Sequence, residues 1–280
     1  MEGGHRGARR GQRLVVDHDA GRVPPRCGGV PAGGDDDAAA QDGGIHGFTL
    51  TVPPPAWENM RMIEICQTCD LALGSWRHCP NYWCGRTDRG WDVVWAVREH
   101  RGRVRWAISE LKYRGDRTWI GPLATLLARF LVERAPLFDH VDLIVPVPSN
   151  VGRARSVDHV GLVVAAARPA IGDLWDVAAP GAVLVKDGET CPLAGAPSAA
   201  VRRLRAAAEV RAALAVTDPG AVVGRRVLAV DDVFTDGSTL REVAFALRRA
   251  GAAAVSGLVL ARQPVRPPGQ PVTGDARMPW

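Results

Sequence analysis

The stretch "VLAVDDVFTDGSTL", Val227 to Leu240, joins an apolar run to a helical pattern through a short polar loop. Its first four residues, Val227 to Val230, are apolar and do not alternate with polar residues, which is typical of a central strand in a parallel sheet covered on both faces. From Leu240 the sequence LREVAFALRRAG repeats apolar residues at helical spacing, and Gly251 is placed to end the helix. The sequence therefore predicts a strand, a turn and a helix in that order.

The turn is rich in groups that bind anions. It consists of Thr235, Asp236, Gly237, Ser238 and Thr239. A strand-to-helix turn presents backbone N–H groups and the positive end of a helix dipole at the carboxyl edge of a sheet, where open α/β folds bind anions. The hydroxyl groups add donors, and the glycine lets the backbone approach a ligand closely. We predict that this phosphate loop, residues 235–239, binds a phosphate group.

Two adjacent carboxylates, Asp231 and Asp232, end the predicted strand beside this loop. They can accept hydrogen bonds from hydroxyl groups or bind the waters of a magnesium ion. A phosphate site next to a diol site describes a ribose 5-phosphate. The stretch resembles the phosphoribosyl pyrophosphate (PRPP) motif of type I phosphoribosyltransferases, and this resemblance implies that the acid pair contacts the ribose hydroxyls during catalysis.

Two other interpretations of this stretch use ordinary structural roles. An acid pair after a strand also occurs in P-loop NTPases, but the chain lacks the glycine-rich lysine loop that those proteins need. Aspartate, serine and threonine also make turns and cap helices without any ligand. Asp236 is where the two interpretations differ most. Its carboxylate either points into the phosphate loop and repels a phosphate, or points outward and caps the helix.

Composition limits the class of protein. The chain has 280 residues, a formal net charge of +5 and a pI near 9.1, which suits a polyanionic ligand or nucleic acid without proving either. Of its 35 lysine and arginine residues, only Lys112 and Lys186 are lysines. No stretch approaches the roughly 20 apolar residues of a membrane span, and no signal peptide is visible, so we expect a cytoplasmic protein without a membrane span.

A second motif is formed by Cys66, Cys69, Cys79 and Cys84. Two close pairs of thiolates separated by a loop suit a tetrahedral zinc ion, which would be structural. His78 stands beside Cys79 and is an alternative ligand. Disulfide bonds are the other alternative, although they are rare in cytoplasmic proteins.

Seven of the nine tryptophans lie between Trp57 and Trp119, among many arginines. Such a mixture can stack bases and neutralise phosphates of single-stranded DNA. Large rings also build the core of a small metal module. Both interpretations stay open at this point.

The rest of the chain alternates helical and strand patterns. Helices are predicted around residues 102–115, 120–135 and 160–170, and strands at Leu143 to Val147 and around residues 252–264. The expected fold class is α/β, with a mostly parallel sheet flanked by helices.

The cysteines, a helix carrying "LKYRG", a strand ending in "PVP" and the acid-pair loop together resemble the competence protein ComF family. This resemblance implies a type I phosphoribosyltransferase-like fold with an N-terminal zinc-ribbon module, and protein partners in DNA uptake. The implied domains are a disordered or mis-annotated extension at 1–58, a zinc module at 62–92, a phosphoribosyltransferase-like domain at 93–267 and a flexible tail at 268–280.

The same resemblance implies further site residues. Pro148, Arg153 and Arg155 would form the pyrophosphate loop, and Lys186 would lie in the hood over the site. Asp236 stands where the family usually has threonine or serine. We therefore expect PRPP to bind weakly or only with magnesium, and three functions remain: an active phosphoribosyltransferase, a non-catalytic nucleotide-sensing or single-stranded DNA-binding protein, and a zinc module that recruits partners.

Overall fold

The computed structural model describes residues 65–73, 76–149, 157–187, 190, 193 and 196–265. All of them belong to one compact unit of the chain. The predicted N-terminal extension 1–58, the tail 268–280, and Arg153 and Arg155 of the predicted pyrophosphate loop lie outside the described residues.

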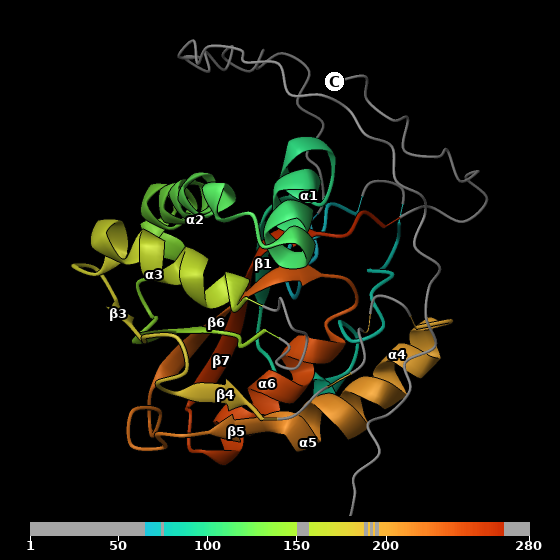
Figure 1. Cartoon of the computed structure of the whole chain (residues 1–280). Helices are drawn as coiled ribbons and strands as arrows, with labels where there is room; N and C mark the ends of the chain where they lie inside the picture. The colour runs from blue at the N-terminus through green and yellow to red at the C-terminus, as the bar shows by residue number, and fades with distance from the viewer. Residues whose placement is uncertain are drawn as a thin grey trace, which may run out of the picture. The chain divides into compact units, whose positions relative to one another are not determined.

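The centre of this unit is a five-stranded sheet in the order β1-β7-β6-β2-β3 (Figure 1). Every neighbouring pair of strands in it is parallel. The strands are β1 (Val94–Glu99), β2 (Leu143–Pro146), β3 (Asp176–Val177), β6 (Arg226–Phe234) and β7 (Ala254–Arg262). A separate antiparallel pair consists of β4 (Leu184–Lys186) and β5 (Leu214–Val216). The predicted mostly parallel sheet is confirmed.

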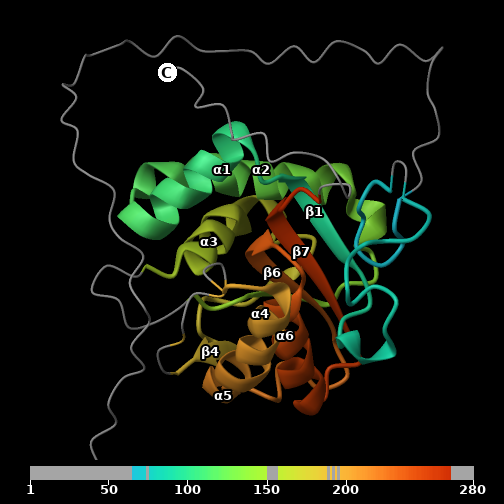
Figure 2. The same cartoon turned by 90° about the vertical axis from the view of Figure 1, so that its right-hand side faces the viewer.

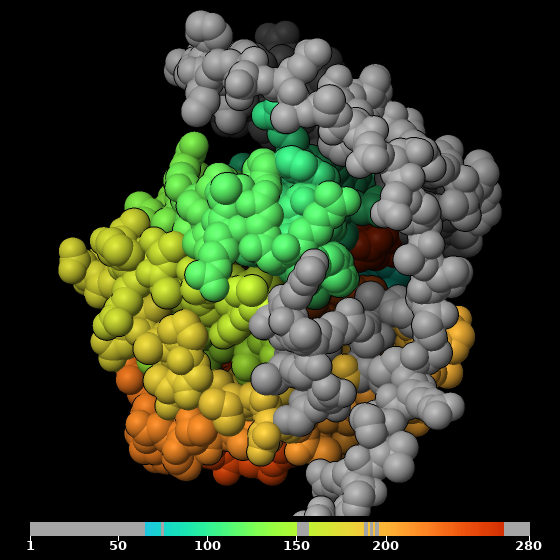
Figure 3. Space-filling model, viewed as in Figure 1, coloured from blue at the N-terminus to red at the C-terminus, as the bar shows by residue number. Residues whose placement is uncertain are grey.

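Helices cover both faces of this sheet (Figures 1 and 2). The first face carries α1 (Gly102–Ser109), its continuation η3 (Glu110–Arg114), α2 (Ile120–Glu133) and α3 (His159–Ile171). The second face carries α6 (Ser238–Arg249), near α4 (Ala199–Arg205), η7 (Ala206–Val210) and α5 (Arg211–Ala213). Short turns of helix are η2 (Thr87–Arg89), η4 (Arg117–Trp119) and η5 (Ala135–Leu137). In the space-filling view, the described surface runs without a break from green residues at the top through yellow residues to orange residues at the bottom (Figure 3).

Side chains alternate between these two faces along β6. Leu228 and Val230 pack in the core with α1, α2 and α3, whereas Val227 and Ala229 pack in the core with α6. All four side chains are essentially inaccessible to solvent, with at most 1% exposed. This double burial explains the non-alternating apolar run, because both faces of a central parallel strand are covered.

The edge strand β1 was not predicted from the sequence. It pairs with β7 from Val94 to Glu99, and its burial falls toward its carboxyl end. The sequence does carry a strand signal here, the apolar run from Val93 to Val97, which was overlooked because it lies among the tryptophans and arginines that follow the cysteine motif.

The chain leaves β2 and β6 in opposite directions. After β2 it passes through α3 on the first face to the edge strand β3, and after β6 it passes through α6 on the second face to β7. The gap between β2 and β6 is therefore a topological switch point, and open α/β sheets bind ligands outside the carboxyl ends of strands at such points.

Candidate functional site

The acid pair lies at this switch point, although it does not end the strand as the sequence predicts. Asp231 and Asp232 lie inside β6, which pairs with β7 as far as Phe234. Pairing with β2 stops at Val230, because β2 ends at Pro146. On the β2 side the acids therefore extend past the neighbouring strand, which leaves them in contact with loops and helices.

The two acids point to opposite faces of the sheet, as consecutive residues of a strand do. Asp232 contacts Lys112 of η3 and His159 of α3, both on the first face. It is only 5% exposed, so it belongs to the core and not to an accessible strand tip. Asp231 instead lines a cavity on the side of the phosphate loop.

Asp232 is held by three hydrogen bonds. Its Oδ2 atom accepts from Lys112 Nζ and lies 2.8 Å from His159 Nε2, while Oδ1 accepts from the backbone N–H of Val233 at 2.6 Å. Burial opposes ionisation of Asp232, but the Lys112 charge and the His159 hydrogen bond together hold its pKa well below the usual range. Burial also opposes the charge on Lys112, and the Asp232 carboxylate raises the pKa of Lys112 above its usual value. Both groups are therefore charged at neutral pH.

Asp231 has a different electrostatic environment. Burial and then the negative charge of Asp232 raise its pKa to about 7, while Lys112 opposes the shift. Its Oδ1 atom accepts from the backbone N–H of Asp232 at 2.8 Å. A carboxyl group that changes charge near neutral pH beside a cavity is typical of functional sites.

A cavity of about 50 Å³ brings Asp231 together with four residues of the phosphate loop. It is several times larger than the 10–15 Å³ that one water needs. Its polar lining includes Asp231, Thr235, Asp236, Thr239 and Arg202. Gly237 also lines it, whereas Ser238 is buried and its hydroxyl has no hydrogen-bond partner within the described chain. Ser238 begins the first turn of α6 and does not line this cavity, and its part in the phosphate site stays a prediction.

The loop glycine is required by its geometry. Gly237 has φ of 87°, in the left-handed region, and a Cβ there would lie 2.5 Å from Trp91 Cη2 and 2.8 Å from Phe234 Cε2. The rings of Trp91 and Phe234 pack edge to face with centroids 6.1 Å apart. The phosphate loop therefore rests on two aromatic side chains.

Asp236 combines the two alternatives considered from the sequence. It lines the cavity, yet its Oδ1 accepts from the backbone N–H of Ser238 at 3.0 Å, which satisfies the first turn of α6. Its Oδ2 lies 3.4 Å from Arg202 Nη1, and both side chains are less than one-fifth exposed. The carboxylate thus occupies a donor that a phosphate would use, and an arginine offsets its charge.

Two other predicted site residues, Pro148 and Lys186, do not line this cavity. Pro148 is half-buried in the segment that follows β2, on the other side of the switch point. Lys186 ends β4, where burial lowers its pKa to about 8 and the charge of Asp231 opposes that shift. Lys186 therefore lies near enough to Asp231 for the two charges to interact.

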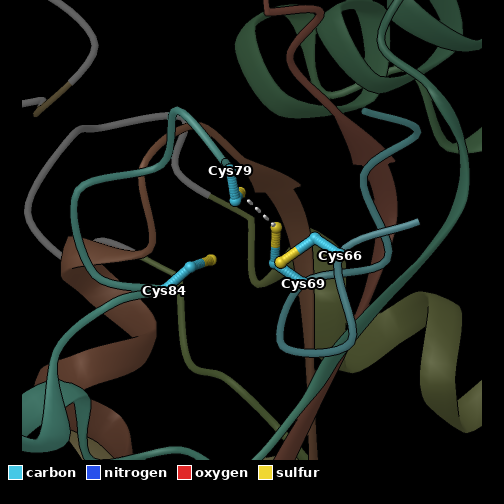
Figure 4. A group of neighbouring side chains, drawn as sticks. All are labelled: Cys66, Cys69, Cys79 and Cys84. Atoms are coloured by element: carbon cyan, nitrogen blue, oxygen red, sulfur yellow. Dashed lines mark hydrogen bonds between the residues drawn. The ribbon is translucent and has the colours of Figure 1, made fainter. Parts of the chain in front are cut away.

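The four predicted cysteine ligands meet in one cluster (Figure 4). All four Sγ atoms lie within 4.8 Å of one another, and those of Cys69 and Cys79 are 3.6 Å apart. Tetrahedral zinc with bonds of about 2.3 Å needs sulfur atoms roughly 3.8 Å apart, so the cluster fits a metal ion. Hydrogen bonds with Cys79 and Cys84 lower the pKa of Cys69, which favours the thiolate that a metal binds. His78 is exposed and does not belong to the cluster.

The cysteine module packs directly against α6. Arg241 of α6 donates to the Asp88 carbonyl at 2.9 Å, and Arg248 donates to the Gly90 carbonyl at 2.6 Å. Arg248 Nη2 also donates to both carboxylate oxygens of Asp92, at 2.7 and 2.8 Å. Cys66, Cys69 and Trp91 share a core with α6 residues. Hydrogen bonds, an ion pair and a shared core therefore join the cysteine module to α6, the helix that begins at the phosphate loop.

Most described tryptophans of the module are packed and not arranged as a binding surface. Trp83 and Trp91 are buried, and Trp95 packs edge to face on Phe138. Trp106 and Tyr113 are exposed, as is Tyr82, which is 46% exposed and has the guanidinium groups of Arg86 and Arg203 at 5.2 and 3.9 Å from its ring centroid. Core packing therefore accounts for the buried rings.

Sequence reasoning missed three residues of this site: Lys112, His159 and Arg202. They lie 120, 73 and 34 positions from the acids that they contact. The scarcity of lysine was the one signal that could have singled out Lys112. His159 and Arg202 carried no local signal.

Among the helices that the structure describes, none has the length and apolar character needed to cross a bilayer. The four cysteines are free thiols, so the disulfide alternative is not seen in this structure.

Comparison with known proteins gives structural similarities only. No protein-family profile matches the sequence, and no curated protein matches it. One similar solved structure is described as the allosteric regulatory enzyme of purine biosynthesis, with 22% identity and a TM-score of 0.33. Another is glutamine PRPP amidotransferase from B. subtilis complexed with ADP and GMP, with 22% identity and a TM-score of 0.35. Each match covers 55% of this chain and 30% of the solved chain, so this chain spans less than a third of either structure. Similarity at this level assigns neither a function nor the ComF family, and both stay predictions.

Proposed function

We propose that this protein binds PRPP or a ribose 5-phosphate nucleotide, together with magnesium, at the carboxyl end of β6. The observation that carries the proposal is the coincidence of the β2–β6 switch point with Asp231 and the phosphate loop. A loop that begins a helix offers backbone donors to a phosphate, and a neighbouring carboxylate accepts hydrogen bonds from ribose hydroxyls.

Each part of the ligand then has a partner of matching chemistry. The 5-phosphate would lie against the loop from Thr235 to Thr239, with Arg202 as its positive charge. The ribose would lie beside Asp231. Pro148 and Lys186 would border the pyrophosphate end, with Arg153 and Arg155 completing that loop.

Magnesium suits the excess of carboxylates around this cavity. Asp231 and Asp236 both line it, and a phosphorylated ligand adds further negative charge. Carboxylate oxygens and phosphate oxygens are the ligands that magnesium prefers, usually with several waters retained. Bound magnesium would offset the repulsion between the ligand and these acids.

If the protein is an active phosphoribosyltransferase, it would transfer the phosphoribosyl group to a nitrogen nucleophile and release pyrophosphate. Thr235 and not an acid stands at the start of the phosphate loop, and Asp236 is paired with Arg202 and the Ser238 N–H, so Asp231 at the end of β6 would be the proton acceptor that lines the cavity. Its pKa of about 7 suits proton transfer near neutral pH.

Isothermal titration calorimetry with PRPP and magnesium tests the proposal. We expect saturable binding by the wild type and a loss of at least about tenfold in Thr239→Ala, since one charge-assisted hydrogen bond is removed. Exposed Thr125→Ala, on α2, is the matched control and should bind as the wild type does. No heat of binding from the wild type would contradict the proposal, and pyrophosphate release with a panel of bases separates a transferase from a nucleotide sensor.

A second function is favoured by one observation. Exposed Tyr82 lies close to two guanidinium groups, a combination that can stack a base of single-stranded DNA and neutralise its phosphates. Fluorescence anisotropy with a labelled oligonucleotide tests this candidate, and Tyr82→Ala should weaken binding. A role in DNA uptake and membership of the ComF family both belong to this candidate, and a reducing cytoplasm would suit the free cysteines.

A further inference from the structure

One of the few lysines in this chain, Lys112, forms the ion pair with the buried Asp232. Arginine provides 33 of the 35 basic residues, with lysine only at positions 112 and 186. Arginine is also the partner of Asp88, Asp92, Asp142, Asp176 and Glu242 in their ion pairs. Asp232 differs from these acids because its cationic partner is a lysine.

An ammonium group suits the space beside Asp232. Lysine carries a compact charge with three donors, whereas arginine carries a planar fork. The Lys112 side chain is 34% exposed while that of Asp232 is 7% exposed, so the lysine connects a buried acid to the accessible end of the sheet. The remaining donors of Lys112 can serve a group outside the core.

The contacts of Asp232 leave it little capacity for a ligand. A carboxylate accepts about four hydrogen bonds. Lys112, His159 and the backbone N–H of Val233 already occupy three of these positions. One acceptor position on Oδ1 remains, but a ribose hydroxyl has little access to it because the residue is only 5% exposed.

Through His159, the hydrogen bonds of Asp232 continue to the segment that follows β2, across the switch point. His159 Nδ1 lies 2.9 Å from Ser149 Oγ, and that hydroxyl donates to Asp158 at 3.1 Å. Ser149 follows the end of β2, and Asp158 caps α3 by accepting from the Gly161 N–H at 3.1 Å. Asp232 is therefore the point where β6, η3, α3 and the segment after β2 are joined.

We propose that the acid pair has divided roles: Asp231 alone receives the ribose hydroxyls, and Asp232, clamped by Lys112 and His159, is a positioning residue. The assignment to ribose rests on the function proposed above. Asp231 lies on the opposite face from the clamp and lines the cavity with the phosphate loop. Asp232 fixes the strand end from which Asp231 projects.

The test compares ribose 5-phosphate with 2-deoxyribose 5-phosphate by calorimetry, because their affinity ratio reports hydroxyl recognition and not general stability. We expect the wild type to prefer ribose 5-phosphate by about tenfold, the effect of one hydrogen bond to a charged group. Asp231→Asn should reduce this ratio to about one with little loss of melting temperature.

The matched variant removes the clamp without leaving an unpaired charge. Asp232→Asn alone should lower the melting temperature, because Lys112 loses its partner. In Asp232→Asn combined with Lys112→Met, the melting temperature should recover in part and the ribose preference should remain. Loss of the preference in the double variant, at a recovered melting temperature, would assign hydroxyl recognition to Asp232 and overturn the division of roles.

A second measurement keeps this inference separate from the proposed function. Because the chain has two lysines, selective ¹⁵N labelling gives two Nζ signals, which Lys112→Arg and Lys186→Arg assign. Asp232→Asn should move the Lys112 signal strongly, and Asp231→Asn should move it less. Wild type that binds neither sugar phosphate overturns the proposed function and the role of Asp231, whereas a Lys112 signal insensitive to Asp232→Asn overturns the clamp itself.

Discussion

The indole of Trp91 lies directly against Gly237, so that a Cβ on this glycine would come within 2.5 Å of Trp91 Cη2. Trp91 follows the four cysteines along the chain and is 2% exposed. The backbone of the phosphate loop therefore has a rigid ring behind it and the cavity in front of it. The shape of the loop depends on this contact.

Gly237→Ala is expected to lower both stability and ligand affinity. The alanine would have φ of 87° and a clash with Trp91 and Phe234, and strain of this kind costs about 1–3 kcal/mol. Thermal unfolding and PRPP titration measure the two effects. Gly121→Ala is the control, because Gly121 lies in α2 with open space around its Cα. Equal melting temperatures for both variants would show that the loop tolerates a side chain.

Metal content provides the second prediction. The purified protein should carry about one zinc ion per chain, since four thiolates form a closed structural site that contributes to folding. Cys69→Ser should lower the zinc content and the melting temperature, and elemental analysis measures the former. His78→Ala should change neither, because this histidine is exposed and lies outside the cluster. If the wild type contains no zinc and the Cys69→Ser variant has the same melting temperature, the cysteine cluster does not bind a structural metal.

The third prediction concerns the carboxylate that competes with phosphate. At about 5 Å and an effective dielectric near 20, Asp236 repels each unit of ligand charge by roughly 3 kcal/mol. Asp236→Thr should therefore tighten PRPP binding at least about tenfold and flatten its dependence on magnesium, because the Ser238 N–H and Arg202 become available.

Asp236→Asn separates charge from helix capping. The amide oxygen can still accept from Ser238, so this variant should keep its melting temperature, whereas the threonine variant loses part of a cap worth about 1 kcal/mol. Both variants should tighten binding if charge is the cause. Unchanged affinity in both would leave Asp236 with a capping role alone.

The fourth prediction follows from the raised pKa of Asp231, about 7 against an ordinary 3.8. The folded protein keeps a proton on this residue between about pH 4 and 7 that the unfolded chain releases, so stability falls as the pH rises through this range. The asparagine of Asp231→Asn cannot ionise, so the stability of this variant does not fall for this reason as the pH rises. Its melting temperature relative to wild type should therefore be higher at about pH 7.5 than at about pH 5. A difference that is the same at both pH values would show that the Asp231 pKa is not raised.

The parts of the site that were predicted from sequence are local in the chain. The acid pair and the phosphate loop follow from one strand-turn-helix pattern, and the cysteine cluster follows from spacing within residues 66–84. Order along the chain is enough in these cases, because each group is assembled from neighbouring residues. The same reasoning predicted the parallel sheet and the helices that cover it.

The parts that could not be predicted depend on contacts between distant segments. Nothing near Asp232 in the sequence indicates that Lys112 and His159 enclose it, so it was expected at an accessible strand tip and is buried. The same is true of Arg202, which reaches Asp236 from another helix. The burial of Ser238 could not be predicted for a local reason, since sequence alone does not say where the first helical turn directs a hydroxyl group.

The pairing of β1 with β7 also constrains how the chain folds during synthesis. Val94 lies opposite Gly257, so the first strand that the structure describes pairs with the last, roughly 160 residues later in synthesis. Contacts between such distant residues slow folding, because a long loop must close before they form. Until β7 has been made, β1 has no partner strand in the sheet, and its unpaired edge is exposed to aggregation during this interval.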